Sequence, residues 1–313
     1  MKKNFFVLLI LLILGYIVIN YFSNKTTGIN NSDNKQINKN NKPIVTWEPK
    51  GQLETTIKPP EHKALSVLLI DSNSQKIIYQ KNPDQQLPIA SLSKLGTAAI
   101  ALEMIGKSKS CKVNTKELNC GEASIGLVNG ERLSVEELLY GMLLNSANDA
   151  AEVLAGSTTK NGRAEYITWM NQKAKKLGLN NTMYINPTGL DEENTTNLSS
   201  AMDLTKLFYY LNNNFPLFKK IMNTNEYVLA ANDLHRNYYL SSTAWDFSNN
   251  YPYLIGGKSG NTDKAGFCLL AQAKKGSNQL LLIILGEPSY TSIRKDSWSL
   301  FNYGFEVLEK QNN

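Results

Sequence analysis

Apolar residues follow patterns typical of both strands and helices over most of the chain. Residues 65–70 and 76–79 are apolar and β-branched on either side of a polar turn, which predicts a β-hairpin. Three more strand-like runs lie far downstream, at residues 253–255, 267–273 and 279–285. Because the predicted strands lie at both ends of this region, we expect one antiparallel sheet built from segments distant in sequence.

Between these strands the apolar residues change to helical spacing. Ser134 and Glu137 precede an apolar run in a capping-box pattern, which predicts that a helix begins there. Further helices are predicted where apolar residues recur every three to four positions, at residues 91–105, 149–155, 162–177, 201–211 and 296–308. The predicted fold class is therefore α+β, with flanking helices and a helical insertion between the two parts of the sheet.

The N-terminal segment has a different character. Residues 5–22 form an almost unbroken apolar run after Lys2 and Lys3, nearly long enough to cross a bilayer core of about 30 Å. A transmembrane anchor over residues 1–23 and a cleaved signal peptide both fit this pattern, but the run lacks the small residues that usually mark a cleavage site. In both cases the positive-inside rule leaves the two lysines in the cytoplasm and sends the rest of the chain outside.

Residues 24–60 are rich in Asn, Lys, Thr and Pro and contain few apolar residues. Such a segment buries too little surface to offset its ordering entropy, so it predicts a flexible tether. Residues 61–313 then form the folded domain. We expect a protein held in the cell membrane by one N-terminal span, with this domain on the outer side.

Composition excludes several classes of function. The net charge is +6, but 29 of the 33 basic residues are lysines spread along the chain, and no basic stripe typical of nucleic-acid binding is seen. The two histidines, His62 and His235, leave little material for a Ser-His-Asp triad or a multi-histidine metal site. We therefore expect no nucleic-acid partner, metal or cofactor, a structural role for His235, and a catalytic base other than imidazole.

Three cysteines raise the question of a disulfide, which an extracytoplasmic location would permit. Cys111 and Cys120 lie in a region expected outside the cell, and their spacing is compatible with a disulfide without deciding it. Cys268 lies in an apolar run and is expected to be a small buried residue.

A lysine held beside a serine is the next candidate for a base. Ser-x-x-Lys on a helix brings an amine to a hydroxyl, and burial or a neighbouring cation lowers the lysine pKa. The pattern occurs four times, as Ser32–Lys35, Ser91–Lys94, Ser157–Lys160 and Ser292–Lys295. Only Ser91 follows a proline and begins an apolar helix, so Ser91 and Lys94 are selected; the alternative is a capping serine with a solvated lysine.

Two further short motifs carry polar groups suited to a cleft. Ser146 and Asn148 lie between two predicted helices, and Lys258-Ser259-Gly260 lies on or beside a strand after two glycines. The lysine and hydroxyl suit a carboxylate ligand, and the glycines permit close backbone approach. Taken alone, the first pair could simply be helix caps and the second a glycine-rich strand edge.

In this order the three motifs resemble those of the penicillin-recognising serine enzymes. Their flanking residues resemble one branch, the low-molecular-mass D-alanyl-D-alanine carboxypeptidases, over residues 62–310. The segments that carry the resemblance are Pro88–Lys94, Glu136–Ala151, Asn186–Leu190 and Gly257–Cys268. The resemblance implies the DD-peptidase/β-lactamase fold and an acyl-enzyme mechanism on peptidoglycan stem peptides that end in D-Ala-D-Ala, with β-lactams as covalent inhibitors.

The resemblance also implies roles for single residues. Ser91 would be the nucleophile, Lys94 its base, and Ser146 the relay of a proton to the departing D-alanine. Asn148 would hold the acyl chain or the lysine. Substrate contacts would come from Lys258, Ser259, Gly260 and Asn261: the first two would bind the terminal carboxylate, and the backbone N–H groups of Ser91 and Asn261 would form the oxyanion hole.

Two departures from the family pattern stand out. Position 259 usually carries Thr, and Ser259 keeps the hydroxyl but lacks the methyl group, so we expect altered efficiency rather than lost function. Many relatives continue into a β-rich domain and an amphipathic anchor, whereas this chain ends at Asn313. Attachment to the membrane is therefore expected to depend on the N-terminal segment.

Two other functions stay open. A β-lactamase of the same fold would need a carboxylate that activates water, and residues 191–194 offer carboxylates, although they follow the peptidase-like Asn186–Leu190 segment. An inactive tethered module that binds cell-wall peptides or β-lactams is the other alternative. Carboxypeptidase and endopeptidase action are not separated by the sequence, nor are roles in the vegetative wall and the spore cortex.

Overall fold

The computed structural model describes residues 46–118, 120–121, 123–248 and 250–311. Within these ranges, no helix combines the length and the apolar character that a membrane crossing needs. The apolar run at residues 5–22 lies outside the described residues, so the membrane anchor stays a prediction.

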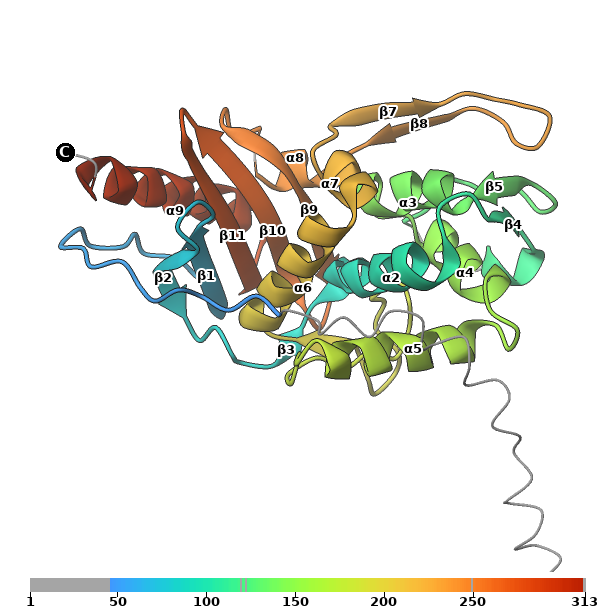
Figure 1. Cartoon of the computed structure of the whole chain (residues 1–313), viewed down its shortest axis with the longest axis horizontal. Helices are drawn as coiled ribbons and strands as arrows, with labels where there is room; N and C mark the ends of the chain where they lie inside the picture. The colour runs from blue at the N-terminus through green and yellow to red at the C-terminus, as the bar shows by residue number, and fades with distance from the viewer. Residues whose placement is uncertain (1–45, 119, 122, 249, 312–313) are drawn as a thin grey trace, which may run out of the picture. The chain divides into compact units, whose positions relative to one another are not determined.

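A five-stranded antiparallel sheet joins the two ends of the domain, in the order β2-β1-β11-β10-β9 (Figure 1). Its strands are β1 (Ser66–Asp71), β2 (Lys76–Lys81), β9 (Leu254–Thr262), β10 (Gly266–Lys275) and β11 (Asn278–Glu287). The pairing of β1 with β11 places Leu69 opposite Leu282, which confirms a sheet made from distant segments. Strand β9 extends well past the predicted residues 253–255. The prediction stopped short because the glycines and polar residues that follow do not alternate with apolar ones.

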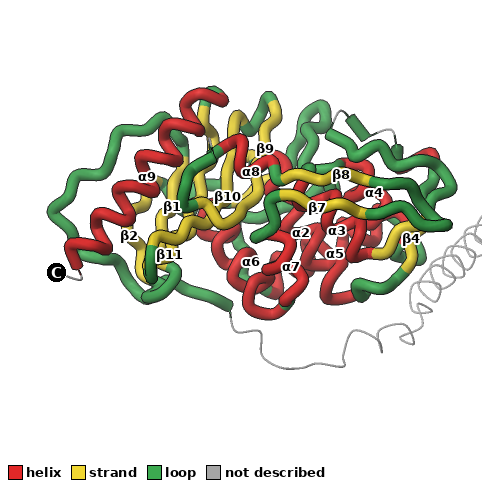
Figure 2. The backbone as a smooth tube through the Cα atoms, turned by 90° about the horizontal axis from the view of Figure 1, so that it is seen from above, coloured by secondary structure: helices red, strands yellow, loops and turns green. Residues whose placement is uncertain are grey.

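Both faces of this sheet are buried. Successive side chains of a strand point to opposite faces, so Leu68 and Ile70 enter one apolar cluster while Val67 and Leu69 enter the other. Helix α9 (Tyr290–Gln311) covers the second cluster, and the other helices except α8 gather on the opposite side (Figure 2). The long apolar strands therefore form the central layer between two helical layers.

The helical insertion follows the predicted order. Its helices are α2 (Lys94–Ile100), α3 (Val135–Leu144), α4 (Asn148–Ser157), α5 (Arg163–Lys176), α6 (Ala201–Asn214) and α7 (Pro216–Met222), of which α7 was not predicted. The capping box at α3 is confirmed: Ser134 Oγ accepts from Glu137 N at 3.2 Å, and Ser134 N donates to the Glu137 carboxylate at 2.6 Å. The helix predicted over residues 91–105 begins as a 3-10 turn, Ala90–Ser93, and ends as a π-helical turn, Ala101–Ile105.

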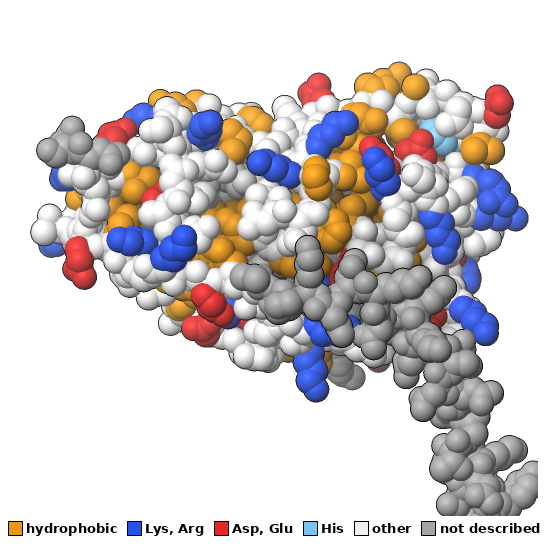
Figure 3. Space-filling view, viewed as in Figure 1, with side chains coloured by type: hydrophobic (Ala, Val, Ile, Leu, Met, Phe, Trp, Pro, Cys, Tyr) orange, Lys and Arg blue, Asp and Glu red, His pale blue; other side chains and the backbone are white. Residues whose placement is uncertain are grey.

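Several short elements carry too little periodicity to be predicted. They are the pairs β3 (Leu87–Pro88) with β6 (Leu198–Ser199), β4 (Ser110–Lys112) with β5 (Arg132–Ser134), and β7 (Glu226–Leu229) with β8 (Tyr238–Ser241), together with α8 (Thr243–Phe247). The β7–β8 hairpin runs along α3 (Figure 1), and apolar side chains lie exposed along its outer edge (Figure 3). In its loop His235 is buried and bonds Arg236 O and Asn232, which fits the structural role predicted for it.

The predicted tether, residues 24–60, extends too far toward the domain. Trp47 stacks on Tyr209 with 4.7 Å between ring centroids, and Leu53 N donates to Ile77 O at 2.8 Å. The end of the segment therefore packs on the folded domain. The prediction from the average composition of residues 24–60 missed this packing. A few isolated apolar side chains are enough to dock a segment that is polar on average.

The three cysteines are buried free thiols. The Cys111–Cys120 disulfide that the spacing left open is not formed: Cys111 lies on β4 in the apolar core, whereas Cys120 lies near the carboxylates of Asp149 and Glu152. Burial raises the pKa of both thiols to about 11. Cys268 is fully buried in β10, as predicted.

Candidate active site

Lys94 and Ser91 face each other at the start of α2. The Lys94 side chain is fully buried, and its Nζ lies 2.9 Å from Ser91 Oγ, 2.7 Å from Asn148 Oδ1 and 2.7 Å from the Thr188 carbonyl oxygen. A neutral amine has two N–H groups and one lone pair. With the amide and carbonyl oxygens accepting the two N–H groups, the lone pair is left for the Ser91 hydroxyl.

The surroundings of Lys94 favour this neutral form. Burial lowers its pKa well below the usual range for lysine, and the positive charge of Lys258 acts in the same direction. The hydrogen-bond partners of Nζ are a hydroxyl, an amide and a backbone carbonyl, none of which carries the negative charge that would hold a proton on the amine. An amine in this state can act as a general base.

The Ser-x-Asn motif connects the two buried lysines. Ser146 lies between α3 and α4 and accepts a hydrogen bond from Lys258 Nζ at 2.8 Å, while Asn148 begins α4 and contacts Lys94. Ser146 has a φ of 60°, a left-handed conformation that costs a non-glycine residue energy. Burial lowers the pKa of Lys258 to about 7.

Strand β9 lies directly against the turn that carries Ser91. A Cβ atom on Gly260 would be 2.7 Å from Ser91 N, closer than side chains approach, so this position requires glycine. Before it, Ser259 is 2% exposed and its Oγ bonds Thr243 Oγ1 at 2.6 Å. After it, Asn261 is exposed; the oxyanion role of its N–H stays a prediction.

The segment 186–190 supports the site from the opposite side. Gly189 has a φ of 89°, and a Cβ there would meet Ala90 O at 1.9 Å, so this loop packs against the turn that carries Ser91. Ala90 itself has a φ of 46°. The two close contacts, from β9 and from this loop, hold the turn in its strained conformation.

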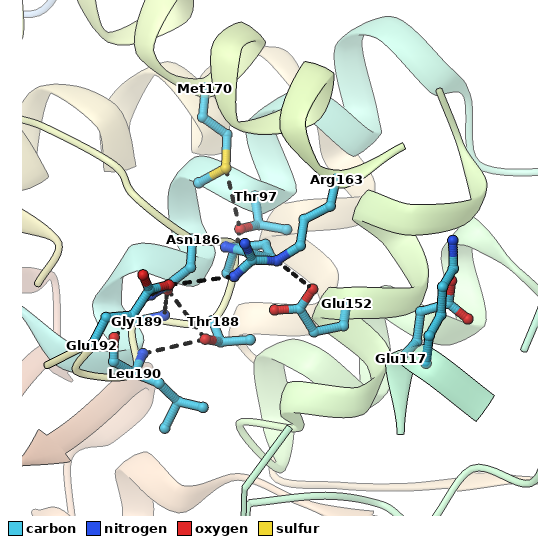
Figure 4. A network of polar contacts seen from close by, with 12 residues as sticks. Thr97, Glu117, Glu152, Arg163, Met170, Asn186, Thr188, Gly189, Leu190 and Glu192 are labelled. Atoms are coloured by element: carbon cyan, nitrogen blue, oxygen red, sulfur yellow. Dashed lines mark hydrogen bonds and ion pairs between the residues drawn. The ribbon is translucent and has the colours of Figure 1, made fainter. Parts of the chain in front are cut away.

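The buried Asn186 side chain holds that loop together (Figure 4). Its Oδ1 accepts from Gly189 N at 2.7 Å and from Thr188 Oγ1 at 3.2 Å, and its Nδ2 donates to Leu190 O at 2.9 Å. These bonds fix the peptide whose carbonyl receives Lys94 Nζ. Asn186 thus positions the oxygen that contacts Lys94 through the loop backbone.

Arg163 links the loop to the helices behind it (Figure 4). Its Nε donates to Glu152 at 2.9 Å, and its guanidinium lies 3.6 Å from Glu192, which in turn accepts from Asn186 Nδ2 at 3.3 Å. Burial raises the pKa of Glu152, and the charge of Arg163 opposes that shift. The ion pairs tie α4, α5 and the loop together beside the site.

Comparison with known proteins identifies the family. The family model for D-alanyl-D-alanine carboxypeptidase matches residues 53–289. This chain belongs to that family. It is 34% identical over 257 residues to D-alanyl-D-alanine carboxypeptidase DacF of Bacillus subtilis (strain 168), covering 79% of this chain but 64% of the relative. It is 33% identical over 236 residues to a D-alanyl-D-alanine endopeptidase of Escherichia coli (strain K12), covering 74% of each.

Solved structures show the same fold. A D-alanyl-D-alanine carboxypeptidase from Mycobacterium tuberculosis H37Rv superimposes with a TM-score of 0.73 at 25% identity, over 82% of this chain and 96% of that one. The Streptomyces K15 DD-transpeptidase superimposes with a TM-score of 0.70 at 25% identity, over 80% and 100%. The predicted fold class and family are both confirmed.

Within this family domain the sequence motifs located most of the site and missed two contacts. The structure brings together the predicted Ser91, Lys94, Ser146, Asn148, Lys258, Ser259 and Gly260. The contact from the Thr188 carbonyl was missed because every residue has a backbone oxygen, so the sequence does not distinguish this one. Thr243 was missed because it lies in a short helix outside every motif.

We expect Gly260→Ala to slow acylation of Ser91 about a hundredfold, the loss typical of one oxyanion donor. The added methyl group would force β9 away from Ser91 N. The rate of covalent labelling by a fluorescent penicillin measures this. Gly276→Ala, in the β10–β11 turn with open space around it, is the control for a glycine-to-alanine change without a steric clash. Equal labelling rates in both variants would contradict the assigned contact.

Proposed function

We propose that this chain is a serine-type D-Ala-D-Ala carboxypeptidase that removes the terminal D-alanine from peptidoglycan stem peptides. The observation that carries the proposal is the 2.9 Å contact between Ser91 Oγ and the buried Lys94 amine, whose pKa burial lowers well below its usual range. This pair supplies the nucleophile and base that the chemistry needs without imidazole or metal. Family membership supports the substrate class.

The reaction proceeds in two stages. Lys94 takes the Ser91 proton while Ser91 Oγ bonds to the carbonyl carbon of the substrate. The resulting oxyanion accepts hydrogen bonds from the backbone N–H groups of Ser91 and Asn261. The Lys94 proton then passes toward the leaving nitrogen, with Ser146 as relay; the peptide C–N bond breaks and D-alanine departs. A water, deprotonated by the same amine, attacks the ester and releases the shortened peptide and Ser91.

Lys258 and Ser259 recognise the substrate in this proposal. An ammonium and a hydroxyl on consecutive residues of β9 suit a terminal carboxylate. Lys258 has no carboxylate among its hydrogen-bond partners in the described part of the chain: Nζ donates to Ser146 Oγ and to Ser259 O, at 2.8 and 2.6 Å. The bound carboxylate would supply the missing counter-charge. A β-lactam carries the same carboxylate next to a reactive carbonyl, so it is expected to acylate Ser91.

The β-lactamase alternative has less support. Two of the three carboxylates in residues 191–194 are engaged elsewhere: Asp191 accepts hydrogen bonds from Thr196 Oγ1 and Lys264 N, and Glu192 faces Arg163. The third, Glu193, is exposed. The peptidase proposal requires that the penicilloyl-enzyme is hydrolysed slowly, so that D-alanine release recovers slowly after penicillin treatment. A β-lactamase would instead hydrolyse penicillin rapidly. An inactive binding module would not need the Lys94 amine placed on the hydroxyl.

We expect the purified protein to release D-alanine from a peptide ending in D-Ala-D-Ala. Ser91→Ala and Lys94→Ala remove nucleophile and base, so each should lower D-alanine release by at least about a thousandfold. Ser157→Ala, from another Ser-x-x-Lys pattern, is the matched control and should retain activity. Release by Ser91→Ala at the wild-type rate would contradict the proposal. Cross-linked muropeptides in the same assay report any endopeptidase action.

The pH dependence should follow Lys258. Its charge, which attracts the carboxylate, is present below its pKa of about 7 and lost above it. The second-order rate constant for acylation should therefore fall as the pH rises beyond about 7, and fall in acid as Lys94 becomes protonated. Lys258→Arg keeps its charge and should lose the alkaline decrease, whatever its absolute rate. A wild-type profile that stays flat into alkaline pH would contradict this assignment.

The proposal includes attachment to the membrane through residues 5–22, with the catalytic domain outside the cytoplasm. The apolar run and the preceding lysines in the sequence support it. The full chain should stay in the membrane fraction after a high-salt wash, and a variant without residues 1–24 should be soluble and still acylated by penicillin. Recovery of the full chain in the cytoplasmic fraction would contradict this part.

A further inference from the structure

Ser259 has a partner outside the three motifs. Its Oγ lies 2.6 Å from Thr243 Oγ1, in the first residue of α8. Helix α8 packs on β9, and Ala244 is fully buried at their contact, where a Cβ on Gly257 would lie 3.2 Å from it. The position of the Thr243 hydroxyl relative to Ser259 is thus set by packing between two elements.

A serine at position 259 needs such a partner more than a threonine would. The second heavy atom on Cβ of Thr restricts χ1, while Ser has three staggered positions available. The hydrogen bond to Thr243 therefore fixes a side-chain position that a serine would not hold by itself. We propose that Thr243 is a positioning residue that holds the Ser259 hydroxyl in place for the terminal carboxylate of the substrate; this rests on the proposed function.

The two hydroxyls can serve a carboxylate without any net proton transfer. Each hydroxyl donates one hydrogen bond and accepts through its lone pairs, and its proton rotates freely. In the free protein Ser259 donates to Thr243. When a carboxylate binds, Ser259 rotates its proton to the carboxylate, and Thr243 donates in turn to Ser259 Oγ. A chain of this kind polarises the hydroxyl that touches the anion and strengthens its bond.

Paired substitutions at position 243 test this role. Thr243→Val keeps the shape and loses the hydroxyl, whereas Thr243→Ser keeps the hydroxyl. We expect kcat/KM for a D-Ala-D-Ala peptide to be about tenfold lower in Thr243→Val than in Thr243→Ser. The same peptide with a C-terminal carboxamide should show no such difference, because it lacks the anion.

Rescue provides the second measurement. In a Ser259→Thr background the methyl group restricts χ1, so adding Thr243→Val should change kcat/KM by less than about twofold. Equal losses with the acid and the amide substrate would overturn the proposal, as would a full tenfold loss in the Ser259→Thr background. If Ser259→Thr does not fold, the comparison of Thr243→Val with Thr243→Ser on the two substrates decides the question alone.

The acylation reaction separates this proposal from the function itself. Rate constants for benzylpenicillin and for its methyl ester compare a ligand with and without the carboxylate, in the same position-243 variants. A protein that is acylated but releases no D-alanine would contradict the carboxypeptidase function. The ratio of the two acylation rates would still confirm Thr243 as the positioning residue or overturn that role.

Discussion

The site depends on two lysine amines buried side by side without a carboxylate bonded to either of them in the described part of the chain. Each amine is instead held by neutral oxygens, from Asn148 and Thr188 around Lys94 and from Ser146 around Lys258. Burial lowers the pKa of both amines, because desolvation penalises the charged form. The fold therefore favours a neutral Lys94 amine beside Ser91 by burying it among uncharged hydrogen-bond partners.

That environment has to be assembled from segments far apart in the chain. The turn that carries Ser91 lies before α2, the Ser-x-Asn motif between α3 and α4, and the third motif on β9. The central sheet makes this arrangement stable, because apolar layers cover both of its faces and fix β9 relative to the helices. Gly260 and Gly189 then let β9 and the 186–190 loop close on the turn from both sides.

Two strained residues lie where these segments meet. Ala90, next to Ser91, and Ser146, beside Lys258, both have left-handed backbones. Such conformations persist when the surroundings determine them. The loop that Asn186 holds together determines the left-handed conformation of Ala90. The ion pairs of Arg163 anchor the same loop to α4 and α5. The network in Figure 4 is therefore part of what positions the base.

The sequence by itself determined the strands of the sheet at both ends of the domain, most of the helices, and the side chains of the three motifs, because periodicity and spacing are local properties. Tertiary structure alone decided the docking of Trp47, the extension of β9 through its polar residues, the Thr188 carbonyl on Lys94 and the Thr243 hydroxyl on Ser259. These depend on contacts between distant segments, and two of them use a backbone oxygen or a residue outside any motif. No local sequence pattern predicts such contacts, because they form only when the sheet and the helical layers pack together.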